Sequence, residues 1–301
     1  MLAPVGERGI RMRTCLTIVA CLAAALPAWS EEPAAAIAVR GALDADAAFA
    51  ARAAERGQRD AFEAVLASDG VLFRPGPVRG LDWMEDHEGS SGRLAWAPAA
   101  AIADCAGQYA VTTGPWTYTS SEGSVLATGD YVSIWRRAAD GDWELVLDNG
   151  VDHAPVADGA GVLAHAWAAL PPPAGARDCG APPRMPALAE TDDRLNAAIR
   201  EDGLATALGA AATRGAVAYR DDEAAGPLAQ ADDAAWPVGT TASRVGDASD
   251  PQSDLGYSYG TLVATVAAGG PPRRAAYVRV WRRDGRHWKL LIDLQSPMDP
   301  S

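Results

Sequence analysis

The stretch that decides the fold is residues 129–148, Gly-Asp-Tyr-Val-Ser-Ile-Trp-Arg-Arg-Ala-Ala-Asp-Gly-Asp-Trp-Glu-Leu-Val-Leu-Asp, because it occurs twice. Residues 275–293 read Ala-Ala-Tyr-Val-Arg-Val-Trp-Arg-Arg-Asp-Gly-Arg-His-Trp-Lys-Leu-Leu-Ile-Asp. Tyr131 matches Tyr277 at an offset of 277 − 131 = 146, and Asp148 matches Asp293 at 293 − 148 = 145. Each copy has two apolar segments around an Asp-Gly turn, a pattern that predicts a β-hairpin.

The same offset of 146 recurs upstream of the hairpin. It joins Asp46 to Asp192, Gly57 to Gly203, Phe73 to Tyr219, Gly80 to Gly226 and Gly114 to Gly260. A single offset that holds over so long a stretch indicates the tandem duplication of a whole domain.

Composition agrees with two globular domains. The chain has 301 residues, of which 49% are hydrophobic and 22% charged, and this length suits two domains of ordinary size. The net charge of −13 opposes binding to nucleic acid or to anionic lipid. We expect no nucleic-acid partner and no cofactor.

Residues 1–30 have the pattern of a signal peptide. Arg8, Arg11 and Arg13 precede the apolar segment 14–26, and Ala28-Trp29-Ser30 fits a cleavage site. The apolar segment is too short for a stable membrane span, so we predict export to the periplasm or the medium. A lipoprotein anchored through Cys21 is the less favoured alternative, because apolar sequence continues past that cysteine. The sequence leaves open whether translation begins at Met1 or at Met12.

Only Cys105 and Cys179 follow the predicted signal peptide. Two cysteines in an oxidising compartment favour one disulfide, and the alternative is a pair of buried thiols. No spacing of cysteine or histidine predicts a metal site.

The element pattern predicts an α+β protein with two similar halves. In the first half we expect a tether at 31–39, helices at 43–56, 59–67 and 80–88, and strands at 71–73, 94–103, 109–119, 125–137 and 143–151. In the second half we expect helices at 188–202, 204–212 and 227–236, and strands at 217–219, 240–246, 256–266, 275–283 and 288–294. Helices grouped before a run of strands are typical of helices packed on one face of an antiparallel sheet.

The order of elements and the motif Gly129, Tyr131, Trp135, Asp140-Gly141, Trp143 and Asp148 resemble the nuclear transport factor 2-like superfamily. The resemblance is greatest to its SnoaL-like, ketosteroid-isomerase-like branch of uncharacterised bacterial domains. It implies two tandem cone-shaped domains, each with helices packed on a curved antiparallel sheet around an apolar pocket. The domains would be residues 41–155 and the more divergent 187–297, joined by a Pro-rich linker at 156–186 with a helical turn at 162–170.

The resemblance specifies the fold better than the chemistry. Ketosteroid isomerase uses an Asp base with Tyr and a protonated Asp as hydrogen-bond donors, and no position of this sequence aligns with that base. The weak catalytic candidates are Asp148, in an apolar strand, and His87, between two acidic residues. For Asp148 and its counterpart Asp293 we favour a structural role at the strand end or in a pair with arginine, because both copies have the residue.

Aromatic residues provide the candidate pocket. Tyr131 and Trp135 alternate along one strand face, and Trp116 with Tyr118 would extend this wall from the neighbouring strand. Packing in the core is the alternative for such residues. The second copy has Leu262 and Ala264 in place of Trp116 and Tyr118, which predicts a poorer pocket there.

We therefore rank the functions in a definite order. A small apolar or aromatic ligand bound in the first cone comes first, and a structural or interaction module with filled cones comes second. An isomerase, dehydratase or hydrolase that uses Asp148 or His87 comes third. Because one sheet face of each domain is apolar and uncovered by helices, we also predict that the copies pack sheet against sheet as an intrachain pseudo-dimer in a mainly monomeric chain.

Overall fold

The computed structural model describes residues 1–2, 32–87, 89, 91–175, 179–180, 186–249, 254–265 and 270–298. The predicted signal peptide lies outside these residues except for Met1 and Leu2, and so does Cys21. Glu32–Ser301 forms one compact unit that contains both copies. None of the helices in the described part of the chain combines the length and apolar character needed to cross a membrane.

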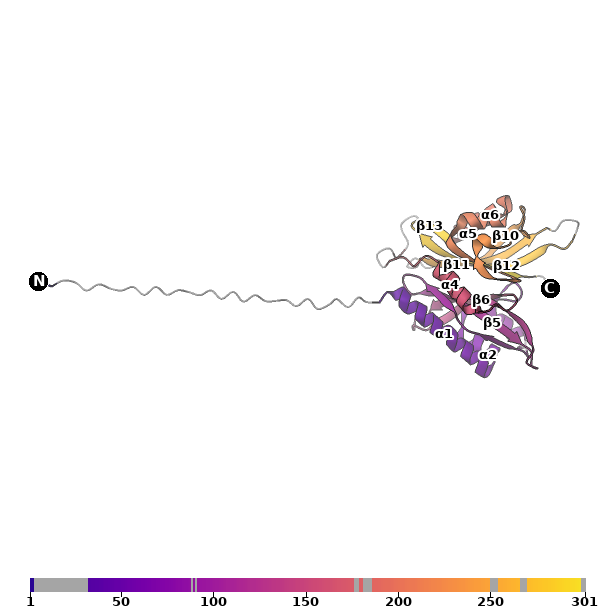
Figure 1. The fold of residues 1–301 in the computed structure, drawn as a ribbon, viewed down its shortest axis with the longest axis horizontal. Helices are drawn as coiled ribbons and strands as arrows, with labels where there is room; N and C mark the ends of the chain where they lie inside the picture. The colour runs from indigo at the N-terminus through magenta and orange to yellow at the C-terminus, as the bar shows by residue number, and fades with distance from the viewer. Residues whose placement is uncertain are drawn as a thin grey trace. The chain divides into compact units, whose positions relative to one another are not determined.

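Within the described residues, the first copy has three helices and a seven-stranded sheet. Figure 1 labels its helices α1 and α2 and its strands β5 and β6. Its elements are α1 (Ala34–Arg56), α2 (Gln58–Val65), β1 (Leu66–Phe73), β2 (Pro77–Arg79), α3 (Gly80–Asp86), β3 (Arg93–Trp96), β4 (Ala100–Ala103), β5 (Tyr109–Thr119), β6 (Val125–Arg137) and β7 (Trp143–Asp152). The strand order is β2-β1-β7-β6-β5-β3, and β4 also pairs with β5.

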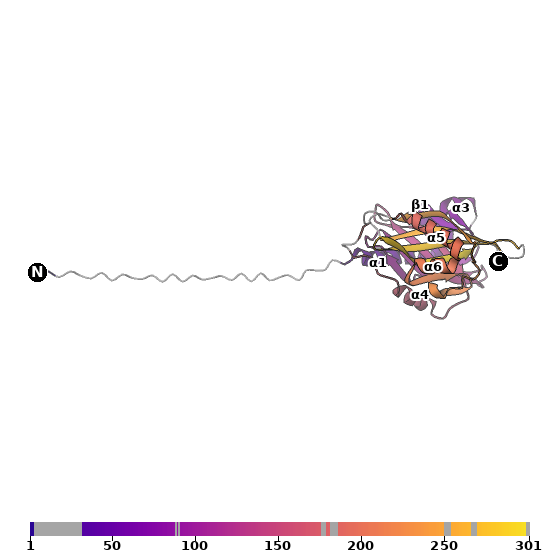
Figure 2. The same cartoon turned by 90° about the horizontal axis from the view of Figure 1, so that it is seen from above.

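The second copy repeats this plan after the helix α4 (Gly159–Ala168). Its elements are α5 (Leu188–Asp202), α6 (Leu204–Ala211), β8 (Ala212–Arg220), β9 (Glu223–Pro227), the 3-10 turn η1 (Leu228–Gln230), β10 (Thr241–Ser249), β11 (Leu255–Ala264), β12 (Arg273–Asp284) and β13 (His287–Pro297). The strand order is β10-β11-β12-β13-β8-β9. Figure 2 shows α5 and α6 lying across the strands of this sheet. The α+β class and the two-copy organisation are thus as predicted.

The sheets are mixed, whereas the sequence predicted antiparallel ones. β1 runs parallel to β7, with Leu72 opposite Asp148, and β8 runs parallel to β13, with Ala218 opposite Asp293. A parallel neighbour requires a long connection, and the whole meander of each copy provides it. The prediction went wrong because pairing between strands so far apart in sequence leaves no local signal.

Two of the repeated glycine pairs have clear steric causes. Gly57 and Gly203 separate the first two helices of each copy at φ of 92° and 84°, a region that favours glycine. At Gly114 a Cβ atom would lie 1.9 Å from the carbonyl oxygen of Ala97, and at Gly260 it would lie 2.1 Å from that of Ser243. Here the neighbouring backbone passes where a side chain would stand.

Several predicted boundaries were wrong. The tether at 31–39 is largely helix, because α1 begins at Ala34 and buries Ala35 and Ala38. The strand predicted at 94–103 is two strands, β3 and β4, interrupted around Pro98, which has no N–H to donate to a ladder. The helix predicted at 227–236 is only the short turn η1.

The two sheets share one hydrophobic cluster, which we call the shared core. Equivalent positions of the two copies enter it as pairs, namely Val71 with Val217, Val132 with Val278, and Ile134 with Val280. All six side chains are buried. Each sheet therefore covers the apolar face that the helices of the other copy leave open.

Helix α4 also belongs to this junction. It contributes Leu163 and Trp167 to the shared core, and Figure 1 shows it between the two copies. The indole N–H of Trp167 donates to the hydroxyl of Tyr219 at 2.7 Å, and this hydroxyl lies 2.9 Å from that of Thr113. Since Thr113 donates its own proton to the carbonyl of Tyr131 at 2.6 Å, Tyr219 is the donor to Thr113.

The junction has a second contact at the pseudo-symmetric position. Phe73 of the first copy, which is equivalent to Tyr219, packs edge-on against Tyr259, which is equivalent to Thr113. The two contacts thus join corresponding positions of the copies. One is a hydrogen bond and the other an aromatic pair with ring centroids 6.3 Å apart.

Candidate binding cavity of the first copy

An open cavity of about 800 Å³ lies between the helices and the sheet of the first copy. This volume lies in the usual range for small-molecule sites. Its apolar wall is made of Phe49, Phe62, Leu72, Phe73, Met84, Leu94, Ala127 and the aromatic residues Trp83, Trp96, Trp116 and Tyr118. Its polar groups come from Arg56, Gln58, Arg59, Arg74, His87, Tyr131, Ser133, Asp148, Asn149, Asp152, Asp221 and Ser296.

Strand alternation decides which side chains face the cavity. Successive residues of a strand point to opposite faces, so Tyr131 and Ser133 of β6 face the helices while Val132 and Ile134 face the shared core. The second copy completes the rim with Asp221, Ser296 and Pro297. The cavity is therefore not built by the first copy alone.

Asp148 is the carboxylate at the cavity wall. It lies directly across from Ser133 in the β6–β7 pair, and the hydroxyl of Ser133 donates to its Oδ1 at 2.6 Å. Burial raises the pKa of Asp148 to about 6, although the hydroxyl of Ser133 and the charge of Arg74 act in the opposite direction. Within the described part of the chain, no basic side chain forms an ion pair with Asp148.

A second carboxylate, Asp46 of α1, lies behind the wall. It is wholly buried and accepts hydrogen bonds from the hydroxyl of Tyr131 at 2.7 Å and from the indole N–H of Trp96 at 2.9 Å. Burial raises the pKa of Asp46, and its hydrogen bonds lower it in part. Asp46 thus fixes two aromatic side chains that line the cavity.

Arg74 lines the cavity without touching Asp148. Its Nη1 donates to the carbonyl of Phe73 at 2.7 Å, and its guanidinium lies 5.4 Å from the ring centroid of Trp83. Burial lowers the pKa of Arg74, and the charge of Asp148 raises it in part.

In the second copy the equivalent space is occupied by Arg279. This residue stands where the first copy has Ser133, directly across from Asp293 in the β12–β13 pair. Its guanidinium is wholly buried and reaches Asp192 at 2.8 Å and Asp293 at 3.2 Å. It also lies 3.9 Å from the ring centroid of Tyr277. The second cone is therefore filled by a side chain at the point where the first one is open.

Other groups of the second copy complete this arrangement. Arg220, equivalent to Arg74, pairs with Asp293 at 2.9 Å and with Asp233 at 2.8 Å. Asn196, which replaces Ala50 of the first copy, accepts a hydrogen bond from Arg279 at 2.7 Å. The carboxylate of Asp293 is thus paired with two arginines, whereas that of Asp148 faces a cavity.

Three of the four residues that the sequence proposed as pocket walls line the cavity, and the fourth does not. Trp116, Tyr118 and Tyr131 line the cavity. Trp135 is not among the lining residues, because it is wholly buried in the cluster behind Phe49 and donates its N–H to the hydroxyl of Thr112 at 2.9 Å. The alternation that placed Trp135 on the correct strand face could not show that α1 covers it.

The two catalytic candidates both line the cavity, but they differ in their surroundings. His87 is exposed at the end of α3, where its ring stacks on Trp83 with centroids 4.3 Å apart. Its Nδ1 lies 2.8 Å from the carbonyl oxygen of Trp83. Asp148 is much the more enclosed of the two.

The sequence reasoning missed Asp46, Arg74, Trp83 and Trp96 as parts of the site. Asp46 had a usable signal, because it recurs as Asp192 at the same offset as Tyr131 and Tyr277. Arg74 lies in the loop after β1, Trp83 in the short helix α3 and Trp96 at the end of the short strand β3, so none of the three stands in a long periodic pattern.

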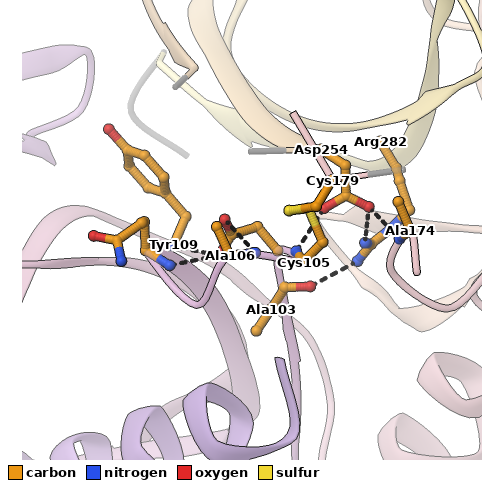
Figure 3. Close-up of a disulfide and its surroundings, with 10 residues drawn as sticks. Ala103, Cys105, Ala106, Tyr109, Ala174, Cys179, Asp254 and Arg282 are labelled. Atoms are coloured by element: carbon orange, nitrogen blue, oxygen red, sulfur yellow. Dashed lines mark hydrogen bonds and ion pairs between the residues drawn. A yellow bond between two sulfur atoms is a disulfide. The ribbon is translucent and has the colours of Figure 1, made fainter. Parts of the chain in front are cut away.

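A disulfide joins Cys105, in the turn between β4 and β5, to Cys179, with an S–S distance of 2.04 Å (Figure 3). Next to it, the wholly buried Asp254 accepts hydrogen bonds from the backbone N–H groups of Cys105 at 2.8 Å and Ala174 at 2.6 Å. Asp254 also pairs with Arg282, which donates to the carbonyl of Ala103 at 3.2 Å. The first copy, the linker and the second copy therefore meet at this disulfide.

No group of three or more His, Cys, Asp or Glu residues in the described ranges is arranged to hold a metal ion.

Comparison with known proteins gives no family model that matches the sequence and no matching curated protein. Several solved structures are similar. A nuclear transport factor 2-like superfamily protein from Salmonella enterica serovar Typhimurium is 14% identical, with 41% of this chain and 96% of that chain covered, at a TM-score of 0.32.

Two further similar structures carry the name of ketosteroid isomerase. A ketosteroid isomerase-like protein from Erwinia carotovora atroseptica is 20% identical, with 38% of this chain and 95% of that chain covered, at a TM-score of 0.31. A Δ5-3-ketosteroid isomerase from Mycobacterium sp. is 20% identical, with 40% and 92% covered, at a TM-score of 0.28.

Proposed function

We propose that this protein binds a small molecule with a flat apolar body in the cavity of its first copy. The observation that carries the proposal is the contrast between the copies, since Arg279 fills the second cone while Ser133 leaves the first one open. Trp116, Tyr118 and Trp83 offer aromatic faces to a flat ligand.

The test uses 2-naphthol as a flat neutral probe and the tryptophan fluorescence of the mature chain as the signal. We expect saturable quenching with one site per chain. Ser133→Arg should abolish binding, because it places in the first cone the side chain that fills the second. Val125→Arg introduces an arginine at an exposed position of the same strand, β6, and should leave binding intact. Absence of saturable binding, or equal binding by Ser133→Arg, would contradict the proposal.

Proton transfer by Asp148 is a second candidate function. A pKa of about 6 suits a general base near neutral pH. Deuterium exchange at the α-carbon of the flat ketone 2-indanone, followed by NMR, tests it. Exchange above the buffer rate that disappears in Asp148→Asn would support catalysis, and exchange at the buffer rate would refute it for this class of carbon acid.

We also propose export after removal of residues 1–30. The charged start and apolar segment of the sequence support it, and the disulfide fits an oxidising compartment. N-terminal sequencing of the protein from a periplasmic fraction should begin at Glu31. A lipid-modified Cys21 at the N-terminus would instead favour the lipoprotein alternative.

A further inference from the structure

We infer that the ligand of the first copy carries a planar cation, of the guanidinium or amidinium class, which lies against Asp148 while its apolar body fills the aromatic part of the cavity. The inference rests on the proposed function, namely that this cavity binds a small molecule. It names the class of ligand, which the proposed function leaves open.

The second copy shows how this fold accommodates such a cation. The guanidinium of Arg279 bridges the carboxylates of Asp192 and Asp293, with contacts of 2.8 Å and 3.2 Å, and lies over the ring of Tyr277. Tyr277 donates its hydroxyl proton to Asp192 at 2.8 Å. Two carboxylates, the amide oxygen of Asn196 and an aromatic face together hold this planar cation.

The first copy keeps this frame and lacks the cation. Asp46, Tyr131 and Asp148 stand at the positions of Asp192, Tyr277 and Asp293. The hydroxyl of Tyr131 donates to Asp46 as that of Tyr277 does to Asp192. The register of the strands is also the same, since Ser133 faces Asp148 and Arg279 faces Asp293.

Two substitutions make room at this place. Ser133 replaces Arg279, and Ala50 replaces Asn196, the residue that accepts a hydrogen bond from Arg279. Tyr131, Ser133 and Asp148 all line the resulting cavity. A ligand cation at this place would contact the carboxylate of Asp148 and lie beside the ring of Tyr131.

Of the arginines that line the cavity, Arg59 and Arg74 are held by other groups and form no ion pair with Asp148, although the charge of Arg74 lowers the pKa of Asp148 in part. Arg74 is held by the carbonyl of Phe73 and by the face of Trp83. Arg59 is bonded to Glu63 and to the carbonyl of His87. Burial without a paired cation is unfavourable for a carboxylate. A bound cation would therefore offset the desolvation free energy of Asp148 that is uncompensated in the free protein.

The test compares two probes of one shape, 2-naphthylguanidine and 2-naphthylurea, by isothermal titration of the whole mature chain at pH 7.5. The two molecules differ in charge and not in outline. Because a hydrogen bond to a charged group is stronger than a neutral one, we expect the guanidinium to bind about ten-fold more tightly or better. Asp148→Asn should bring the ratio of the two affinities close to one and leave the urea's affinity within about two-fold.

Asp140→Asn is the control, since it removes an exposed carboxylate of the β6–β7 turn that does not line the cavity, and it should retain the preference for the cation. Equal affinities in the wild-type chain would overturn the inference without any variant, and so would a preference that survives Asp148→Asn. If the urea and 2-naphthol bind but the guanidinium is not preferred, the inference fails and the proposed function stands. If none of the three binds, the proposed function fails as well.

Discussion

At the residue scale, two aspartates at equivalent positions of the copies differ in their surroundings. Asp148 faces a cavity with a single hydroxyl donor, and Asp293 is paired with Arg220 and Arg279. The sequence favoured a structural role for both. The pairing of Asp293 agrees with that interpretation, while Asp148 stands in the wall of the candidate site.

The same substitution should therefore change stability in opposite directions at the two positions. Asp148→Asn removes a poorly solvated charge and should raise the free energy of unfolding at pH 7.5 by about 1–3 kcal/mol. Asp293→Asn leaves two buried arginines short of a counter-charge and should lower it by roughly 3 kcal/mol or more. Urea denaturation of both variants measures the two differences. If both substitutions changed the free energy of unfolding in the same direction, the arginines and the cavity around these aspartates would not determine how each negative charge affects stability.

The gain from Asp148→Asn should depend on pH in a defined window. The pKa of Asp148 in the folded protein is about 6, above its ordinary value of 3.8, so the folded state binds the proton more tightly than the unfolded state. Its contribution to stability is complete below about pH 4 and is lost as the pH rises through 6. The difference between variant and wild type should therefore be near zero at pH 3.5 and constant above pH 7. A difference that is as large at pH 3.5 as at pH 7.5 would contradict the raised pKa.

At the scale of elements, the disulfide should contribute strongly because it closes a long loop. Cys105 and Cys179 are separated by 74 residues, for which the chain-entropy account gives a stabilisation of roughly 2–5 kcal/mol. Cys105→Ser, Cys179→Ser and the double variant should all lose the same amount in urea denaturation, since each removes the same bond. A double variant that loses clearly more than either single one would show that the two sulfurs act separately.

The hydroxyl of Tyr219 offers a second test at this scale. Tyr219→Phe leaves the indole N–H of Trp167 buried without its acceptor and takes the donor away from Thr113. We expect a loss of about 1–3 kcal/mol. Phe73→Tyr at the equivalent position is the matched comparison, because it adds the hydroxyl where Tyr259 packs edge-on. No loss in Tyr219→Phe would mean that water replaces the hydroxyl.

Most elements could be predicted from local patterns, and the exceptions have physical causes. The hairpin β6–β7 and its repeat have strong alternation and turn signals, so the predicted bounds of these strands lie close to the observed ones. The parallel pairing of β1 with β7 depends on residues more than seventy positions apart, such as Leu72 and Asp148. At the site, Ser133 and Arg279 could be aligned from the sequence, but only the packing shows that Arg279 is buried between two carboxylates.

At the scale of the whole molecule, the shared core predicts a monomer. Each sheet already buries its open face against the other copy, so a further partner gains little apolar contact there. Light scattering of the mature chain should give the mass of one chain, and a stable dimer would contradict this expectation.

The first copy alone should behave differently from the whole chain. Residues 34–155 without the second copy expose Val71, Val132 and Ile134 and lose Ser296 and Asp221 from the cavity rim. We expect this fragment to self-associate and to bind 2-naphthol more weakly than the whole chain does. A soluble monomeric fragment of full stability would show that the second copy is not needed as a support.

The two contacts at the junction have a consequence for how the halves recognise each other. Thr113 meets Tyr219, and Phe73 meets Tyr259, so corresponding positions are joined by different chemistry. Two first copies brought together in this way would set Thr113 against Phe73 twice and leave each hydroxyl facing a phenyl ring. Two second copies would set Tyr259 against Tyr219 twice. Four phenol rings would then have to fit where the observed junction holds three aromatic rings and one threonine. Only the mixed pairing satisfies both contacts, so the duplicated halves have become complementary and are no longer interchangeable.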